Sequence, residues 1–382
     1  MVRLDDSRYS GRVGVSMPQL RNITISTTLT CNEACAHCWV SAGPRRSEDM
    51  TTAEIRRVLG EAAVLGAEHV KFTGGEPLVR SDLPDLVEHA HTLGFRVSIE
   101  TNGLLLRRGL LKSLSRSGAS PHLYVSLDGA NRHTHDRFRM KPGAFNTTVA
   151  NLREAREQDY YFSVHTVVRR QMVDELPALH ELVRSLGASQ HKLILTLQDL
   201  GRGRRIRAQA EASLDEMFAV IDSLPPQEFW DYGWDPAPTR ETRLMTTLPP
   251  AFQPAGTPVV TCGWSQSFLA VLADGSVALC HGLYDLDEAI AGNLRSDSLA
   301  EIWKSSTLFE TTRSWSGDEL SGICGNCVVR HECRGLCRAS AIGRYRDLAA
   351  PYPTCQQLFD AGLFPEQMIE DPARDSSYVC VT

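Results

Sequence analysis

Long apolar runs are missing from this chain of 382 residues. No stretch approaches the ~20 consecutive apolar residues that a helix needs to cross a bilayer. The segment 1–16 also has no hydrophobic stretch of the kind that marks a secretory signal. Positive charge is not in excess, because the net charge is −6, so the surface has no general attraction for nucleic acid. We therefore expect a cytosolic protein that binds neither membrane nor nucleic acid.

Cysteine is absent from residues 39–261, although the chain has 11 cysteines. Three of them lie within residues 31–38, and the other eight lie from Cys262 onward. Because the cytosol keeps thiols reduced, cysteines gathered in this way indicate metal binding rather than disulfides. The distribution predicts two separate metal regions.

The first region has the spacing Cys31-x3-Cys35-x2-Cys38 and follows a strand-like segment that ends near Thr30. Three thiolates on one short loop can hold three corners of a cubane iron-sulfur cluster, which leaves the fourth iron open to a cofactor or substrate. The triplet fits structural zinc poorly, because structural zinc takes four protein ligands.

The cysteine-free middle of the chain consists of repeated strand and helix patterns. The helix predicted over Thr52-Leu65 begins with a capping box, Thr51-x-x-Glu54, and other helices are expected to end at Gly94, Gly118 and Gly187. Six such units imply a parallel sheet. The predicted strands are Leu20-Thr28, Glu68-Phe72, Phe95-Glu100, His122-Leu127, Tyr161-Val168 and Lys192-Leu197.

Polar motifs follow three of these strands: Gly74-Gly75-Glu76, Thr101-Asn102, and Ser126 with Arg139 further on. The glycines let the backbone approach a ligand closely, and a guanidinium such as that of Arg139 suits a carboxylate. Ordinary turns and surface ion pairs are the alternatives. His165, Gln198 and Asp199 fall on or just past the last two strands and are candidates to face a substrate.

The second cysteine region begins with Cys262 and Cys280, on either side of a hairpin predicted at Asp274-Gly275. A denser group follows and ends near residue 355. From spacing alone, part of this group also fits a zinc ribbon. The members of the denser group are Cys324, Cys327, Cys333, Cys337 and Cys355.

Together these motifs resemble the radical S-adenosylmethionine (SAM) enzymes that have a C-terminal SPASM extension. The resemblance implies an α/β fold, a partial (β/α)6 TIM-like barrel with a small cysteine-rich SPASM domain. It also implies SAM bound to the open iron, with reductive cleavage to a 5'-deoxyadenosyl radical. The SAM contacts that it implies are Gly74, Gly75, Glu76, Thr101, Asn102, Ser126 and Arg139.

The resemblance further implies three iron-sulfur clusters, each expected to be 4Fe-4S. One is the SAM-binding cluster held by Cys31, Cys35 and Cys38. The outer auxiliary cluster takes Cys324, Cys327, Cys333 and Cys355, and the inner one takes Cys262, Cys280 and Cys337. The inner cluster then lacks one protein ligand, and Gly256 stands where some relatives have a cysteine.

Cys380 near the C-terminus is the one remaining thiol. It is a candidate for the missing ligand or for a catalytic hydrogen donor, and an inert tail cysteine is the alternative. The chain is divided on this basis into an N-terminal extension (1–19), the radical SAM core (20–200), a connecting region (201–260), the SPASM domain (261–358) and a tail (359–382).

The resemblance favours oxidative modification or cross-linking of a ribosomally made peptide, with a carbohydrate or aminoglycoside epimerase or dehydrogenase as the alternative. Only about 20 residues precede the first predicted strand, too few for a leader-binding domain. A separate leader-peptide-binding protein is therefore an expected partner, together with a flavodoxin or ferredoxin as electron donor. The basic loop Gly201-Arg205 is expected to be solvated or to contact acidic groups of a substrate.

Overall fold

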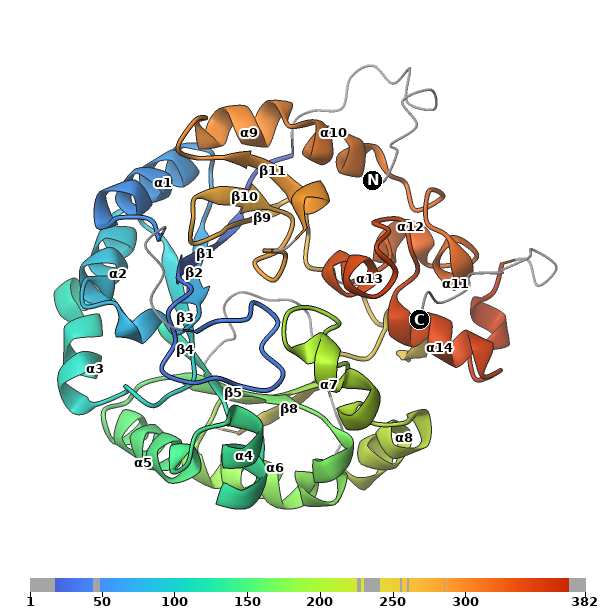
Figure 1. Ribbon diagram of the computed structural model, residues 1–382, viewed down its shortest axis with the longest axis horizontal. Coiled ribbons are helices and arrows are strands. Elements are labelled where there is room, and N and C mark those ends of the chain that lie inside the picture. Colours follow the sequence, from blue (N-terminus) through green and yellow to red (C-terminus); the bar gives the residue numbers. More distant parts are fainter. Residues whose placement is uncertain are drawn as a thin grey trace.

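The computed structural model describes residues 18–43, 49–224, 228–229, 241–254, 256–259, 261–284 and 286–370. Cys380 lies outside these residues. The described strands form one mixed sheet in the order β11-β10-β9-β1-β2-β3-β4-β5-β6-β8-β7. Helices surround this curved sheet on its outer side (Figure 1), so the architecture is the predicted α/β partial barrel.

The six predicted strands are confirmed, each within a few residues of its expected bounds. They pair in parallel in chain order, so all their carboxyl ends lie at one edge of the sheet. These strands are β1 (Asn22–Thr28), β2 (His69–Gly74), β3 (Arg96–Thr101), β4 (His122–Ser126), β5 (Phe162–Val167) and β6 (Gln190–Ile194).

The helix expected after Thr51 is α1, and its capping box is present, with the Thr51 side chain accepting from the Glu54 amide. Its apolar face is fully buried against the sheet, where a Leu or Ile side chain contributes about 1.5–3 kcal/mol. The core helices are α1 (Thr52–Val64), α2 (Leu83–Thr92), α3 (Arg108–Leu114), α4 (Arg132–Arg139), α5 (Ala144–Glu157) and α6 (Leu176–Leu186).

Strands from two later parts of the chain extend this sheet at both ends. The connecting region adds β8 (Arg243–Thr246), parallel to β6, and β7 (Glu228–Phe229) beside it. At the other end, β9 (Phe268–Val271) pairs in parallel with β1. β10 (Ser276–Ala278) and β11 (Ile290–Asn293) continue the sheet as antiparallel strands, and the hairpin expected at Gly275 is confirmed.

The remaining helices complete the enclosure. α9 packs beside α1, where Leu299 N donates to Glu61 Oε2 at 2.6 Å. α11 to α14 lie across the opening between α10 and α8 (Figure 1). Their bounds are α7 (Gly203–Ala210), α8 (Leu214–Ser223), α9 (Leu299–Ser305), α10 (Thr307–Ser314), α11 (Gly322–Gly325), α12 (Arg330–Cys333), α13 (Arg338–Tyr345) and α14 (Pro353–Asp360).

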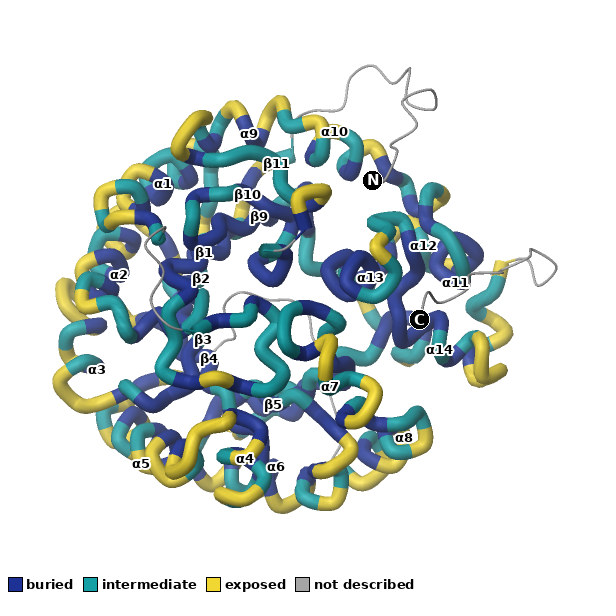
Figure 2. Tube along the Cα trace, viewed as in Figure 1, coloured by how far each residue is buried: buried dark blue, intermediate teal, exposed yellow. Residues whose placement is uncertain are grey.

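Burial follows this arrangement. The strands are buried along most of their length, and exposed residues lie on the outer faces of the helices (Figure 2). No described helix is both long and apolar enough to cross a membrane. The carboxyl ends of the strands and the C-terminal helices together enclose one central cavity.

Candidate functional site

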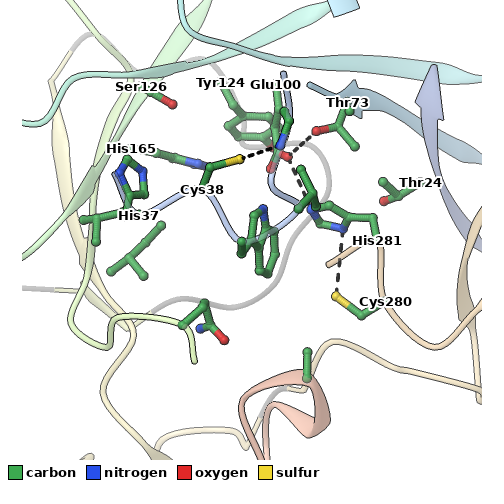
Figure 3. A pocket seen from close by; sticks show the side chains of 18 of the residues that line it. Thr24, His37, Cys38, Thr73, Glu100, Tyr124, Ser126, His165, Cys280 and His281 are labelled. Carbon is green, nitrogen blue, oxygen red and sulfur yellow. Dashed lines mark hydrogen bonds and ion pairs between the residues drawn. The ribbon is translucent and has the colours of Figure 1, made fainter. Parts of the chain in front are cut away.

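The central cavity has a volume of about 380 Å³ and is lined from both ends of the chain. Cys31, Cys35 and Cys38 face it from the loop after β1, while Cys262, Cys280 and Cys337 line it from the C-terminal third. Figure 3 shows Cys38 and Cys280 among the residues around this space. The fold thus brings the first predicted metal region and part of the second to one cavity.

The loop that carries the first three thiols is held by its own backbone. Cys31 N donates to Gly43 O at 2.9 Å, and Cys38 N donates to Cys35 O at 3.2 Å. Burial raises the pKa of the Cys31 thiol to about 11, although a hydrogen bond from the Glu33 amide partly opposes this rise. Burial also raises the pKa of Cys35. Such thiols ionise readily only beside a cation, as metal ligands do.

Arg139 is the cation that the protein places beside this loop. Its Nη1 lies 3.7 Å from Cys35 Sγ and 3.6 Å from Glu33 Oε2, and its Nη2 lies 2.5 Å from Asp128 Oδ2. Burial opposes the ionisation of Asp128 most strongly, but Arg139, together with His37 and Arg169, lowers the pKa of Asp128 to about 2. Arg139 lines the cavity as an already paired cation.

Sequence reasoning missed Glu33 and Asp128 as members of this cluster. Glu33 lies inside the cysteine motif, and Asp128 directly precedes Gly129 in the segment that supplied Ser126. Burial raises the pKa of Glu33, and Arg139 partly offsets this rise. The sequence signal was an acidic residue within each motif, but the pairing needed the fold to bring α4 against the loop.

α4 also packs against the centre of the cysteine loop. His37 stacks on Phe138 with ring centroids 4.0 Å apart, and the Arg169 guanidinium lies 3.9 Å from the same ring. Ala36 N donates to Phe138 O at 3.0 Å. Burial, and then the charge of Arg139, lower the pKa of His37 to about 3, so this imidazole is neutral at physiological pH.

The glycines at the end of β2 are required by a close approach within the protein. A Cβ on Gly74 would lie 2.2 Å from Thr28 O, and one on Gly75 would lie 2.3 Å from Thr30 O. From the sequence we expected these glycines to allow a close approach to a ligand. Both glycines do line the cavity, but their first role is to let β2 pass against the chain that leads into Cys31.

Glu76 lies directly behind residues that line the cavity and is not itself among them. Its carboxylate accepts from Thr101 Oγ1 at 2.8 Å and from Asn102 N at 2.7 Å, and Leu78 N donates to it at 3.0 Å. Burial raises its pKa to about 7, against the effect of these hydrogen bonds. Thr101 and Asn102 themselves line the cavity, so Glu76 orients the residues that do.

Asn102 connects this motif to the cysteine loop, because its Nδ2 donates to Asn32 Oδ1 at 2.7 Å. Ser126 also lines the cavity, and Figure 3 shows it on the wall that carries His165. The expected SAM-contacting motifs therefore surround the loop of Cys31, Cys35 and Cys38, with Glu76 placed behind them.

Polar side chains at alternate positions of the strands form a second wall. Ser126, His165 and Lys192 are neighbours in register on β4, β5 and β6, and all three line the cavity. The expected position of His165 is thus confirmed. Because successive side chains of a strand point to opposite faces, Lys192 could have been found as a polar residue on the same face of the sheet as His165.

Glu100 is the centre of the adjoining part of this wall. Lys71 Nζ lies 2.9 Å from its carboxylate, and Thr73 Oγ1 donates to it at 3.1 Å. Burial disfavours the charge of Glu100, but Lys71, followed by His281, lowers its pKa. Tyr124 packs against His165 in the same wall, with centroids 4.8 Å apart.

One expectation at the end of the core needs correction, and the basic loop that follows has a contact that was not expected. Asp199 does not line the cavity but pairs with Arg207 at 3.1 Å and Arg344 at 2.8 Å, whereas Gln198 does line it. In the basic loop, Arg202 is not simply solvated. It donates to Cys35 O at 2.9 Å and to Ala42 O at 2.7 Å, so it supports the cysteine loop.

The C-terminal thiols fall into two groups. The charge of Cys337 acts on both Cys262 and Cys280; burial, and then this charge, raise the pKa of Cys262 to about 12. In the second group, Cys355 is buried and feels the charges of the other three. This second group consists of Cys324, Cys327, Cys333 and Cys355.

Each cysteine that the structure describes is a free thiol. Among these same residues, no three His, Cys, Asp or Glu side chains gather in a way that would hold a single metal ion. The ligands of a cubane cluster bind irons at different corners. The cysteines of one cluster therefore need to surround a shared volume and do not need to converge on a single atom.

Comparisons with known proteins agree with this arrangement. Residues 25–183 match the Radical SAM superfamily, and residues 262–328 match SPASM, an iron-sulfur cluster-binding domain. The chain is 30% identical over 343 residues to an AdoMet-dependent heme synthase of Methanosarcina barkeri, covering 88% of this chain and 96% of the relative.

Two further similarities are to a peptide cyclase and to a protein whose crystal structure contains a bound precursor peptide. A PqqA peptide cyclase of Xanthomonas euvesicatoria is 26% identical over 351 residues, which covers 90% of each chain. The crystal structure of Streptococcus suis SuiB bound to precursor peptide SuiA has a TM-score of 0.68 at 14% identity. It covers 89% of this chain and 76% of SuiB, and it supports the fold alone.

Proposed function

This chain belongs to the radical SAM superfamily and has a C-terminal SPASM domain, and we propose that it removes a hydrogen atom from a ribosomally made peptide, leading to an oxidative modification or cross-link. The observation that carries the proposal is the shared cavity. The loop of Cys31, Cys35 and Cys38 faces it from one side and three C-terminal thiols face it from the other.

Cys31, Cys35 and Cys38 would hold the SAM-binding cluster. Gly74, Gly75, Thr101, Asn102, Ser126 and Arg139 line the cavity beside them and would surround SAM. SAM, when bound there, supplies a 5'-deoxyadenosyl radical, which takes a hydrogen atom from the substrate.

The chain's own residues would prepare this chemistry. Arg139 stays charged and fixed by Asp128, while Glu76 holds Thr101 and Asn102 in place. His165 and Lys192, which line the cavity on β5 and β6, would hold polar groups of the substrate. Fixed groups of this kind place reacting atoms together and lower the entropic cost of reaction.

The two C-terminal thiol groups would hold auxiliary clusters, the inner one at Cys262, Cys280 and Cys337 and the outer one at the second group. Cysteine thiolates are the usual protein ligands of such clusters. The inner thiols lie on the cavity wall and the outer ones do not, so the inner site would be the one that a substrate meets. A flavodoxin or ferredoxin would donate electrons.

The similarity to PqqA peptide cyclases over nine-tenths of both chains supports a peptide substrate. A separate leader-peptide-binding protein would deliver such a peptide. The second candidate is a role in heme synthesis, which the 30% identity to the heme synthase of M. barkeri favours. These two candidates differ in the molecule that loses hydrogen, and this difference can be measured.

The first experiment is anaerobic reconstitution followed by assay of 5'-deoxyadenosine formed from SAM and dithionite. The wild-type chain should form it, and the variant with Cys31, Cys35 and Cys38 all replaced by Ala should not. Cleavage of SAM by that triple variant would refute the assignment.

The second experiment uses deuterated candidate substrates, namely short peptides encoded beside the gene and heme-precursor tetrapyrroles. Deuterium found in 5'-deoxyadenosine with a peptide supports peptide modification. Transfer from a tetrapyrrole alone contradicts it and supports the second candidate.

A further inference from the structure

Trp39 joins the two thiol-bearing walls of the cavity. It directly follows Cys38, and its ring meets that of His281 edge-on, with centroids 4.7 Å apart and an interplanar angle of 89°. His281 in turn directly follows Cys280. One aromatic side chain thus extends from the N-terminal cysteine loop to the loop that carries an inner thiol of the SPASM domain.

The indole also lies directly on the backbone of Gly282. A Cβ built on Gly282 would lie 2.8 Å from Trp39 Cε3 and 3.0 Å from Cζ3. Gly282 is not among the glycines with positive φ, so its backbone conformation is open to any residue. The need for glycine at this position therefore comes from the space that the indole occupies.

On its other side, His281 approaches the core of the fold. Its Nε2 lies 3.8 Å from Glu100 Oε2, and Glu100 is bound to Lys71 and Thr73 of β2. Figure 3 shows His281 between Glu100 and Cys280, with interactions to both. The Cys280 loop thus packs against Trp39 on one side and approaches Glu100 of β3 on the other.

We infer that Trp39 is a positioning residue that fixes the inner auxiliary cysteine loop relative to the SAM-binding cysteine loop, through its contact with Gly282 and His281. The inference rests on the proposed function, since it assumes a cluster at each loop. Close-packed contacts are hard to compress, so a shift of the Cys280 loop moves the indole, and the indole moves the backbone at Cys38.

The test inserts one methyl group at the contact. Gly282→Ala places a carbon against the indole, although the substitution lies in the SPASM domain. We expect it to alter the electron paramagnetic resonance (EPR) spectrum of the reduced N-terminal cluster and the change that SAM produces in it. Gly60→Ala is the matched control, because its Cβ would meet nothing within 4 Å, and it should leave both unchanged.

A double variant tests whether the effect of Gly282→Ala arises from its contact with the Trp39 indole. In the double variant Trp39→Val with Gly282→Ala, the smaller side chain leaves room for the methyl group, and the N-terminal spectrum should resemble that of Trp39→Val alone. If Gly282→Ala with full iron content matches the Gly60→Ala control, the inference is wrong. It is also wrong if the methyl group changes the spectrum equally with and without the indole.

Trp39→Phe keeps the test decisive if Gly282→Ala fails to take up iron. The smaller ring should loosen the Cys280 loop and broaden the EPR signal of the inner auxiliary cluster, at unchanged iron content. An unbroadened signal would overturn the inference. If the wild-type chain binds no clusters or does not cleave SAM, the proposed function itself fails, and this inference fails with it. If the wild-type chain binds its clusters and cleaves SAM, but the substitutions at Gly282 and Trp39 do not affect the cluster on the other wall, only this inference is wrong.

Discussion

Arg139 Nη2 lies 2.5 Å from Asp128 Oδ2, and both side chains are more than nine-tenths buried. Asp128 also accepts from Val167 N at 2.8 Å, so it joins α4, which carries Arg139, to β5. The guanidinium reaches Cys35 from this fixed position. Removing either charge would leave the other buried beside the cysteine loop.

Asp128→Asn should lower the free energy of unfolding by about 3–5 kcal/mol, because breaking a buried ion pair leaves an uncompensated charge. Thermal or urea unfolding of the anaerobic protein measures this loss. Asp85→Asn is the control: its pair with Arg116 is half-exposed on both sides, and such pairs contribute about 0–1 kcal/mol. Equal losses in the two variants would contradict the role given to Asp128.

Arg202→Gln should weaken retention of the N-terminal cluster, since the variant loses the hydrogen bonds to Cys35 O and Ala42 O. Arg204→Gln is matched to it, because Arg204 is exposed and donates to Asp199 O at 3.3 Å, away from the cysteine loop. Iron content during dilution under chelator compares the two. Identical iron loss from both variants would show that the cysteine loop does not depend on Arg202.

Glu76 should make stability depend on pH between about 4.5 and 7. Burial raises its folded pKa to about 7, so the folded protein keeps a proton that the unfolded chain releases. This contribution is present below pH 4.5 and is lost as the pH rises to 7. At about 1.4 kcal/mol per pKa unit, the free energy of unfolding of Glu76→Gln should rise by roughly 3 kcal/mol relative to that of the wild type as the pH increases across this range. Parallel stability curves would disprove it.

The buried pair of His180 and His191 should act in the opposite direction. Their Nδ1 atoms lie 3.1 Å apart, and burial, with His180 adding to it, lowers the pKa of His191 to about 3. The contribution of His191 to the free energy of unfolding is then fully present above pH 6.5. Below this pH the unfolded chain takes up a proton that the folded protein does not, so the free energy of unfolding falls by about 1.4 kcal/mol per pH unit. His191→Gln should flatten this acid limb in thermal unfolding curves, and an unchanged slope would contradict the assignment.

Iron analysis should separate the three cysteine sets. The reconstituted wild-type chain should bind about twelve irons if three cubanes form. Cys262→Ala and Cys327→Ala should each lose about four and stop substrate modification, while 5'-deoxyadenosine still forms. If either substitution removes all the iron, the clusters do not assemble independently.

Local signals in the sequence predicted local structure well. The capping box predicted at Thr51 is present, because it depends on residues only three positions apart; Ser213 and Ser298 begin helices with the same local pattern. The six core strands were found from their apolar composition, and the parallel sheet followed from their alternation with helices.

Contacts between distant segments could not be predicted in this way. Nothing in the composition of Phe268–Val271 states that it pairs with β1 rather than closing a separate domain. The expected position of Asp199 was wrong for the same reason, and the support that Arg202 gives to the cysteine loop was not foreseen. Their partners, the carbonyl of Cys35 and the guanidinium of Arg344, are more than a hundred residues away in the sequence.

The pairing of Asn22 with Phe268 has a consequence for biosynthesis. β1 leaves the ribosome long before β9 exists, so one edge of the nascent sheet waits for its neighbour while most of the chain is made. Contacts this distant in sequence form slowly. The outer edge of β1 is thus expected to be covered late, after β1 to β6 have been made and can pair with one another.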